Sequence, residues 1–292
     1  MPEVLAPPAT PELAKSNPHS RRYTGIRPGG TWSSLDLREM WEFRDLLFAL
    51  ASRDLKLRYK QTALGVIWVI LQPLMAAGIF SFVFGKVAKM PSSGVPYFLF
   101  SYAGLLGWNL FNNTVTKIAT CLVGNAQLLS KVYFPRLILP LSNVPSVLVD
   151  FAVAAGMLGV MMAANHRPPP ILLLLLPFWG SIIVILALGG GLISASLSVA
   201  YRDIQYILPV ALQMLLYGCP IAYSASVVPE RYRLIYYLNP LSAPLEAFRS
   251  SLLGTPMPSA QALTFSSVVS LICLALGLYS FKRLERTFAD VI

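Results

Sequence analysis

Six apolar segments follow one another along the chain, and most of them are long enough to cross a lipid bilayer. A hydrocarbon core about 30 Å thick requires roughly 20 apolar residues in an α-helix. Backbone polar groups inside a bilayer must be paired within the segment, so the sequence predicts an all-α integral membrane protein with six transmembrane helices. The fifth segment is the weakest, because it is short and contains Pro209, Gln213 and Pro220. The segments cover residues 63–85, 97–119, 137–163, 171–200, 206–224 and 262–281.

The composition argues against an ordinary soluble enzyme. Only 12% of the residues are charged and 55% are apolar, whereas charged residues make up about 25% of a soluble domain. A net charge of +10 in a soluble protein would suggest a nucleic-acid partner. In a membrane protein the same charge is typical of basic cytoplasmic ends and loops, so we expect no nucleic acid.

Two segments precede the first apolar segment. Residues 1–34 are polar and rich in proline, which favours a disordered cytosolic tail. Residues 35–61 predict an amphipathic helix in the headgroup layer, and the alternative is a packed helix of a soluble cytosolic subdomain. The remaining residues, 62–292, form the predicted six-span domain. The polar arc of the helix contains Glu42, Asp45, Ser52, Arg53, Lys56 and Lys60, and the apolar arc contains Met40, Phe43, Leu46, Leu47, Leu50 and Leu57.

Lysine and arginine predict the orientation, because cytoplasmic loops carry more of them than outer loops. With the N-terminus inside, most of the 23 basic residues lie on the cytosolic side. Both termini are therefore expected in the cytosol. Besides the N-terminal region, the inner set contains Lys131, Arg136, Arg202, Lys282, Arg283 and Arg286; the outer set contains Lys86, Lys89, Arg167, Arg231, Arg233 and Arg249.

The connection between the fifth and sixth segments, about 225–261, is long and not simply hydrophilic. Apolar helical pieces outside a span usually lie at the interface or dip back into the bilayer. We expect two short re-entrant or interfacial helices here. An external cap packed on the spans is the alternative.

The sequence contains few candidate catalytic residues. Asp150 is the one acidic residue well inside a span, so no pair of carboxylates is placed for acid–base work. Its role is either conduction or a hydrogen bond that holds the second and third spans together. We predict no catalytic residue, metal site or cofactor on this chain. The expected partners of Asp150 are Asn109, Asn112, Asn113 and Thr114.

Small and aromatic residues add two further expectations. Glycines at 189–191, followed by Ser194, Ala195, Ser196 and Ser198, predict a helix-packing face. Tyrosines flank or occupy the fifth span, as Tyr217 and Tyr223 do. Aromatic residues at span ends normally form interface belts. Their flat apolar faces and polar tips also suit sugar rings.

Three stretches resemble a known family: the membrane subunits of type-2 ABC exporters for polysaccharides, namely O-antigen, capsule and teichoic acid. The resemblance covers about residues 38–285, and the middle motif is the most specific. The first stretch reads WEFRDLL at 41–47, RDLKLRYKQT at 53–62 and LGVIW at 64–68, with Gln72 and Pro73 following. The second reads NAQLLSKVYFPR at 125–136, with Leu139 and Pro140. The third reads LNPLS at 238–242, with Phe248, Arg249, Leu253 and Gly254.

The resemblance implies a homodimer in the cytoplasmic (inner) membrane, with two ATPase subunits that carry ATP and magnesium. It implies that residues 125–136, called the coupling segment below, dock into the ATPase. Within this segment, Tyr133, Phe134 and Pro135 form a compact anchor of the kind that dominates interfaces. First and fifth spans in the family line the passage. The coupling residues are Asn125, Leu128, Lys131, Tyr133, Phe134, Pro135 and Arg136; the expected passage residues are Trp68, Gln72, Gln213, Tyr217 and Tyr223.

The expected cargo is a lipid-linked glycan passed from the inner leaflet outward. Its carrier phosphate would meet Arg53, Lys56, Arg58 or Lys60, unless these residues bind ordinary anionic lipid. Two other functions remain open at this stage. One is a type-2 permease for a small hydrophobic substrate such as a drug, and the other is a non-transporting membrane scaffold.

Overall fold

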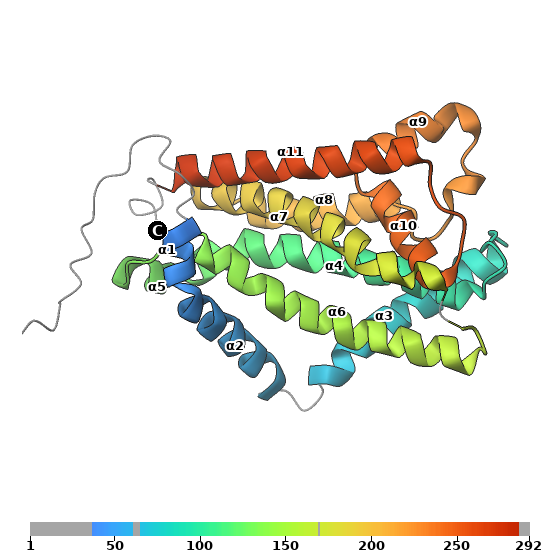
Figure 1. Ribbon diagram of the computed structural model, residues 1–292, viewed down its shortest axis with the longest axis horizontal. Helices are drawn as coiled ribbons and strands as arrows, with labels where there is room; N and C mark the ends of the chain where they lie inside the picture. Colours follow the sequence, from blue (N-terminus) through green and yellow to red (C-terminus); the bar gives the residue numbers. More distant parts are fainter. Residues whose placement is uncertain (1–36, 61–64, 169, 286–292) are drawn as a thin grey trace, which may run out of the picture. The chain divides into compact units, whose positions relative to one another are not determined.

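The computed structural model describes residues 37–60, 65–168 and 170–285, and every regular element in these ranges is a helix (Figure 1). The predicted tail at 1–34 lies outside them. The elements are α1 (Leu37–Glu42), α2 (Arg44–Lys60), α3 (Gly65–Phe80), η1 (Ser81–Val87), α4 (Tyr97–Gly124), α5 (Ala126–Lys131), α6 (Ile138–Ala164), η2 (Ile171–Leu175), α7 (Leu176–Ala200), α8 (Ile204–Tyr217), η3 (Ala225–Val227), α9 (Glu230–Leu238), α10 (Ser242–Leu253) and α11 (Ala260–Leu284).

Four helical stretches of the described chain are long and apolar enough to cross a membrane: Ile67–Val87, Ile138–Ala164, Ile171–Ala200 and Ala260–Leu284. They correspond to the first, third, fourth and sixth predicted segments. The second segment became α4, which has 28 residues but a more polar sequence. The fifth became α8, which ends at Tyr217 after 14 residues. At 1.5 Å per residue, α8 is about 21 Å long and thus shorter than a hydrocarbon core.

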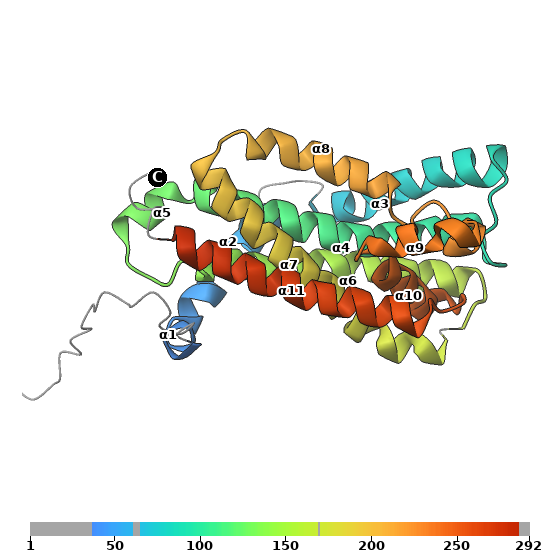
Figure 2. The same cartoon turned by 90° about the horizontal axis from the view of Figure 1, so that it is seen from above.

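Helix α4 is central, since α3, α6, α7, α8 and α10 all pack against it (Figure 2). This position explains how the helix accommodates polar side chains. The Tyr102 hydroxyl donates to the Ala154 carbonyl of α6 at 3.0 Å. Lys117 Nζ donates to Ser146 Oγ of the same helix at 2.8 Å. A polar side chain inside a membrane protein is tolerated when a neighbouring helix supplies its partner.

Helices α7 and α11 approach each other at two glycines. A Cβ atom on Gly189 would lie 2.5 Å from the carbonyl carbon of Cys273, and one on Gly277 would lie 2.6 Å from the Gly189 oxygen. Gly191 faces Ile118 of α4, where a Cβ would lie 2.9 Å away. The predicted packing face at 189–191 is therefore confirmed for Gly189 and Gly191. Gly190 has nothing within 4 Å of a Cβ position.

Helices α1 and α2, with Phe43 between them, turn the predicted apolar arc toward the protein. Leu50 is buried, and Met40, Phe43, Leu46 and Leu47 pack against the same apolar cluster, which also contains residues of α4, α6, α7 and α11. Leu57 is an exception to the predicted arc, because it is 51% exposed. Two large apolar residues that the helical wheel did not single out are exposed: Trp41 of α1 at 69% and Phe48 of α2 at 63%.

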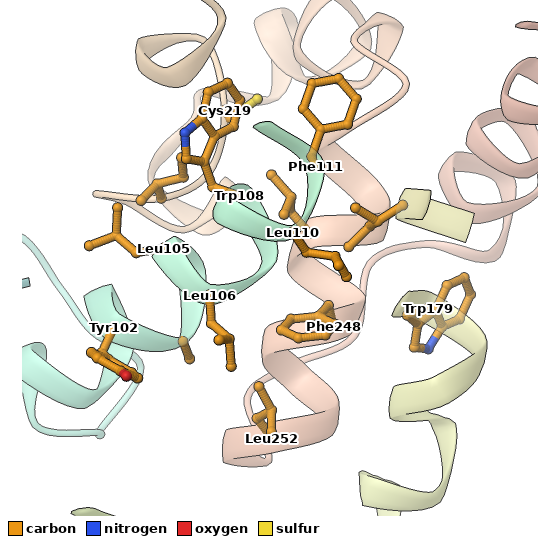
Figure 3. Close-up of a cluster of buried hydrophobic side chains, with 14 of the residues drawn as sticks. Tyr102, Leu105, Leu106, Trp108, Leu110, Phe111, Trp179, Cys219, Phe248 and Leu252 are labelled. Atoms are coloured by element: carbon orange, nitrogen blue, oxygen red, sulfur yellow. The ribbon is translucent and has the colours of Figure 1, made fainter. Parts of the chain in front are cut away.

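Helix α10 lies inside the bundle. Its residues from Ser242 to Leu252 are buried, and it packs against α4, α7 and α11. Figure 3 shows Phe248 and Leu252 of this helix facing the row of large apolar side chains on α4. The helix ends at Gly254, whose φ of 68° is the left-handed conformation that favours glycine. Helix α9 is more exposed than α10, with Leu234 at 78% and Ile235 at 63%.

Candidate coupling and transport surfaces

The coupling segment starts at Asn125, which joins three parts of the chain. Its backbone oxygen accepts from the amides of Leu128 and Leu129 at 3.0 and 3.1 Å, and these bonds begin α5. Its side-chain Nδ2 donates to the Cys121 carbonyl at 2.9 Å. Its Oδ1 accepts from Arg53 Nη2 of α2 at 3.0 Å. The end of α4 and the middle of α2 therefore both fix the start of the segment.

The two aromatic residues of the segment have opposite environments. Tyr133 is 62% exposed and its neighbour Val132 is 50% exposed, and Lys131 is exposed as well. Phe134 is only 4% exposed and belongs to the apolar cluster of Leu50 and Phe281. We expected both rings to form the docking surface, but Phe134 is part of the core. The backbone becomes extended at Val132, directly after α5, and Phe134 then returns to the cluster of Leu50 and Phe281.

The remaining coupling residues are partly buried. Leu128 and Leu129 are partly buried against the same apolar cluster. Pro135 and Arg136 are half-buried. The Arg136 guanidinium donates through Nη1 to the backbone oxygen of Glu285, directly after α11. The segment is thus held at its end as well as at its start.

Four of the five expected passage residues are exposed on two helices. Trp68 and Gln72 are spaced by one helical turn on α3, and Gln213 and Tyr217 have the same spacing on α8. Trp68 is 54% exposed and Tyr217 is 63% exposed. Both helices pack against α4 and lie on the same side of the bundle in Figure 2. Each pair is therefore part of an exposed helix face that another subunit or lipid can cover.

Tyr223, the fifth expected passage residue, has a different environment. It lies in the connection between α8 and η3 and is half-buried. Its ring centroid is 6.2 Å from that of Tyr236 on α9. The structure therefore does not bring Tyr223 together with the exposed pairs on α3 and α8.

The basic residues expected to bind a phosphate all lie on α2. Arg53 and Lys56 are exposed, whereas the side chains of Arg58 and Lys60 lie outside the described part. Arg53 already has protein partners, because its Nη2 is 3.0 Å from Asn125 Oδ1 and 3.5 Å from Asp54 Oδ1. Lys56 is thus better placed than Arg53 for a headgroup.

Asp150 lies beside a residue that we did not expect as its partner. The carboxylate of Asp150 is 3.9 Å from Lys117 Nζ on α4, and Lys117 also donates to Ser146, one helical turn before Asp150. The ion pair connects the helices of the second and third predicted segments, as the packing alternative requires. The amide residues that we expected as partners of Asp150 lie earlier on α4 than Lys117 does; they are Asn109, Asn112 and Asn113.

A buried charged cluster in the last third of the chain was missed. Arg249 was assigned to an outer loop, but it is 2% exposed inside α10. Its Nη1 donates to the Pro220 carbonyl at 2.7 Å, and its guanidinium carbon lies 3.9 Å from the centroid of the Phe100 ring. Its Nη2 is 3.7 Å from Glu246 Oε1. The i, i+3 spacing of two opposite charges in an apolar helix was the available signal.

Glu246 connects this cluster to the segment that follows α8. Its Oε1 accepts from the Ala225 amide at 2.6 Å, and its Oε2 accepts from the Tyr237 hydroxyl at 2.9 Å. Burial, followed by the negative charge of Glu246, raises the pKa of Tyr237, so this hydroxyl stays protonated and remains a donor. The cluster holds α9 and the connection at 220–225 against α10.

The described part of the chain is all-helical, and four of its helical stretches are long and apolar enough to cross a membrane, which is the architecture of a multi-pass membrane protein. The family model described as "ABC-2 type transporter" matches residues 45–253. The chain belongs to this family. The match includes α4, the coupling segment, α8 and the buried charged cluster.

Several known proteins are similar over nearly their whole length. An O-antigen export system permease protein RfbA of Klebsiella pneumoniae is 27% identical over 253 residues, which cover 85% of this chain and 95% of the relative. A protein of the same name from Myxococcus xanthus is 28% identical, with coverage of 88% and 98%. The polysialic acid transport protein KpsM of Escherichia coli is 25% identical, with coverage of 81% and 92%.

Proposed function

We propose that this chain is the transmembrane subunit of an ATP-driven exporter for a lipid-linked polysaccharide. The observation that carries the proposal is similarity to O-antigen export permeases over at least 95% of the relatives' length. The polysialic acid transport protein extends the similarity to a second kind of glycan. The cargo is accordingly a long glycan of the O-antigen or capsule type, carried on a lipid.

The proposed topology has six spans in the cytoplasmic membrane and both termini in the cytosol. Helix α4 supplies the second span, since its 28 residues extend about 42 Å. Helix α8 supplies the fifth span together with the turn after it, where Cys219 and Ile221 are buried. The excess of lysine and arginine on the proposed inner side supports this orientation. Helices α1 and α2 lie in the headgroup layer, with Trp41 of α1 and with Phe48 and Lys56 of α2 outward, and α9 and α10 enter the bilayer from the outer side.

The working complex is a homodimer with two ATPase subunits, which carry ATP and magnesium. The exposed side of the coupling segment, with Lys131, Val132 and Tyr133, contacts the ATPase. ATP binding draws the two ATPases together, and the coupling segments move with them. This chain contributes no catalytic residue to ATP hydrolysis.

The passage lies between the two copies. A packed bundle fills its own centre with side chains, so a single copy leaves little room for a sugar chain. The exposed pairs Trp68 with Gln72 and Gln213 with Tyr217 supply aromatic and amide groups along the walls. Weak contacts repeated at many positions permit movement, whereas a single tight site would stall the chain.

Deletion of the gene in its native cell tests the function. We expect the glycan to disappear from the cell surface and to accumulate inside, and we expect this chain to restore export. Purified complex in vesicles should hydrolyse ATP faster when lipid-linked glycan is added. Altered drug resistance with normal surface glycan would contradict the proposal in favour of a drug permease. ATPase association without any stimulated hydrolysis would favour a scaffold.

The two aromatic residues of the coupling segment should separate docking from folding. Tyr133→Ala removes an exposed ring, so we expect weaker ATPase association, by about 2 kcal/mol, with unchanged thermal stability in detergent. Phe134→Ala leaves a cavity in the core and should lower the free energy of unfolding by about 3–5 kcal/mol. Co-purification of the ATPase and thermal unfolding measure the two effects. Loss of stability in Tyr133→Ala alone would show that Tyr133, and not Phe134, supports the core.

Cross-links across the proposed passage should stop export. We expect Gln72→Cys or Tyr217→Cys to be linked to the second copy by a bifunctional thiol reagent with a cleavable spacer. The linked complex should lose export, and cleavage should restore it. Ile272→Cys on α11 is the control, because this residue is 52% exposed on another helix and should give no linked dimer. Full export by a dimer linked in high yield would show that the glycan passes elsewhere.

A further inference from the structure

Arg53 of α2 donates a hydrogen bond to Asn125 of the coupling segment, and the proposed function gives this contact no role. We propose that Arg53 is a positioning residue that fastens the start of the coupling segment to α2, so that α2 and the segment move as one body. The inference rests on the proposed function, because it requires the segment to receive motion from an ATPase. It replaces the role in phosphate binding that the sequence suggested for Arg53.

The polar contact is directional and joins residues far apart in sequence. Arg53 Nη2 donates to Asn125 Oδ1 at 3.0 Å across a sequence separation of 72 residues. The other side of the Asn125 amide is fixed, since its Nδ2 donates to the Cys121 carbonyl at 2.9 Å. Asp54 Oδ1 lies 3.5 Å from the same Arg53 nitrogen. The guanidinium is therefore directed toward the coupling segment, and the asparagine is oriented to receive it.

An apolar contact lies next to this polar one. Leu50 precedes Arg53 by about one helical turn and is 6% exposed, in the same cluster as Phe134 at 4%. Leu128 and Leu129 of α5 pack against that cluster. Separation of α2 from the segment would expose these apolar side chains as well as break the hydrogen bond. Both costs favour motion of the two elements together.

The far end of the segment is fastened too. The Arg136 guanidinium donates to the Glu285 backbone oxygen after α11. Between the two arginine contacts, Val132 and Tyr133 face outward. Figure 1 shows α5 at the same end of the bundle as the start of α2 and the end of α11. A force on the outward side is therefore passed to α2 and α11 instead of bending the segment.

A double-mutant cycle tests the contact. The variants are Arg53→Ala, Asn125→Ala and their combination, in purified complex with the ATPase in vesicles. Each single change should lower export per ATP hydrolysed by about threefold to tenfold, and the double change should be no worse than either. Arg53→Lys should restore part of the loss, because lysine still donates to Asn125 Oδ1. The comparison is Lys56→Ala, whose effect should add to that of Asn125→Ala.

A second measurement does not depend on the cargo. Hydrogen exchange of the α5 amides in the purified chain should become faster in Arg53→Ala and stay unchanged in Lys56→Ala. A thiol cross-linker that joins Arg53→Cys to Asn125→Cys within one chain should leave export intact, because the two sites keep their distance. Additive losses, unchanged exchange in Arg53→Ala, or a block of export by this cross-link would each overturn the proposal. Absence of glycan export by the unmodified complex, with faster exchange in Arg53→Ala, would instead refute the proposed function.

Discussion

Replacement of Arg249 by Met is expected to destabilise the protein by about 3–5 kcal/mol. The substitution keeps an unbranched apolar stem but removes the guanidinium, so it leaves the Glu246 carboxylate buried at 6% exposure without its cation. Removal of one partner from a buried ion pair costs this much because the remaining charge is uncompensated. The change also removes the hydrogen bond to the Pro220 carbonyl and the contact with the Phe100 ring. Thermal unfolding and size-exclusion profiles in detergent measure the effect.

A surface pair in the same chain provides a matched control. Arg233 and Glu230 have the same i, i+3 spacing, with 3.5 Å between Nη1 and Oε1, but their side chains are 44% and 89% exposed. Exposed pairs contribute about 0–1 kcal/mol, so Arg233→Met should change little. Addition of Glu246→Gln to Arg249→Met should recover part of the loss by removing the buried charge. Equal stability of Arg249→Met and Arg233→Met would contradict the structural role of the cluster.

Substitution of Gly189 by Ala is expected to be among the most damaging single-methyl changes in the part of the chain that the structure describes. The new Cβ would lie 2.5 Å from the Cys273 carbonyl carbon and 2.6 Å from its oxygen. Because these are backbone atoms, no rotamer change relieves the contact, and α7 must move away from α11. We expect a loss of at least about 3 kcal/mol, the upper end of typical overpacking costs.

The adjacent glycine is the control for this change. Gly190 lies in the same helix with nothing within 4 Å of its Cβ position. Gly190→Ala should therefore be neutral or stabilising by up to about 1 kcal/mol, because alanine favours a helix more than glycine does. Thermal unfolding of the two variants gives opposite signs if the crossing of α7 and α11 requires Gly189. A similar decrease in both variants would refute this requirement.

The hydropathy pattern of the sequence predicts helices that contact lipid better than helices that contact protein. Four expected spans are found with boundaries shifted by a few residues, since long apolar faces are needed wherever lipid is the neighbour. Helix α4 is less apolar because it contacts other helices, and α10 is short because it lies inside the bundle. Composition alone does not distinguish a polar residue with a partner on another helix from one in a loop, and for this reason Arg249 was assigned to the outside.

The same limit applies to the coupling segment. The motif at 125–136 identifies the segment, but periodicity does not say which of Tyr133 and Phe134 faces the core. Their environments depend on α2 and α11, which are distant in sequence and supply Leu50 and Phe281 to the cluster around Phe134. The contact between Arg53 and Asn125 is equally non-local. Contacts that depend on the folding of distant segments are visible only in the structure.

The central position of α4 has a consequence for biogenesis. Among the elements that pack against it, α3 and η1 are synthesised before α4, whereas α6, α7, α8 and α10 all emerge later. Until then, Tyr102 and Lys117 lack their acceptors on α6. A polar side chain without a partner is costly in lipid, so α4 has to remain beside the translocon or a membrane chaperone while the next helices are made. Nascent chains that end before α6 are therefore substrates for membrane quality control.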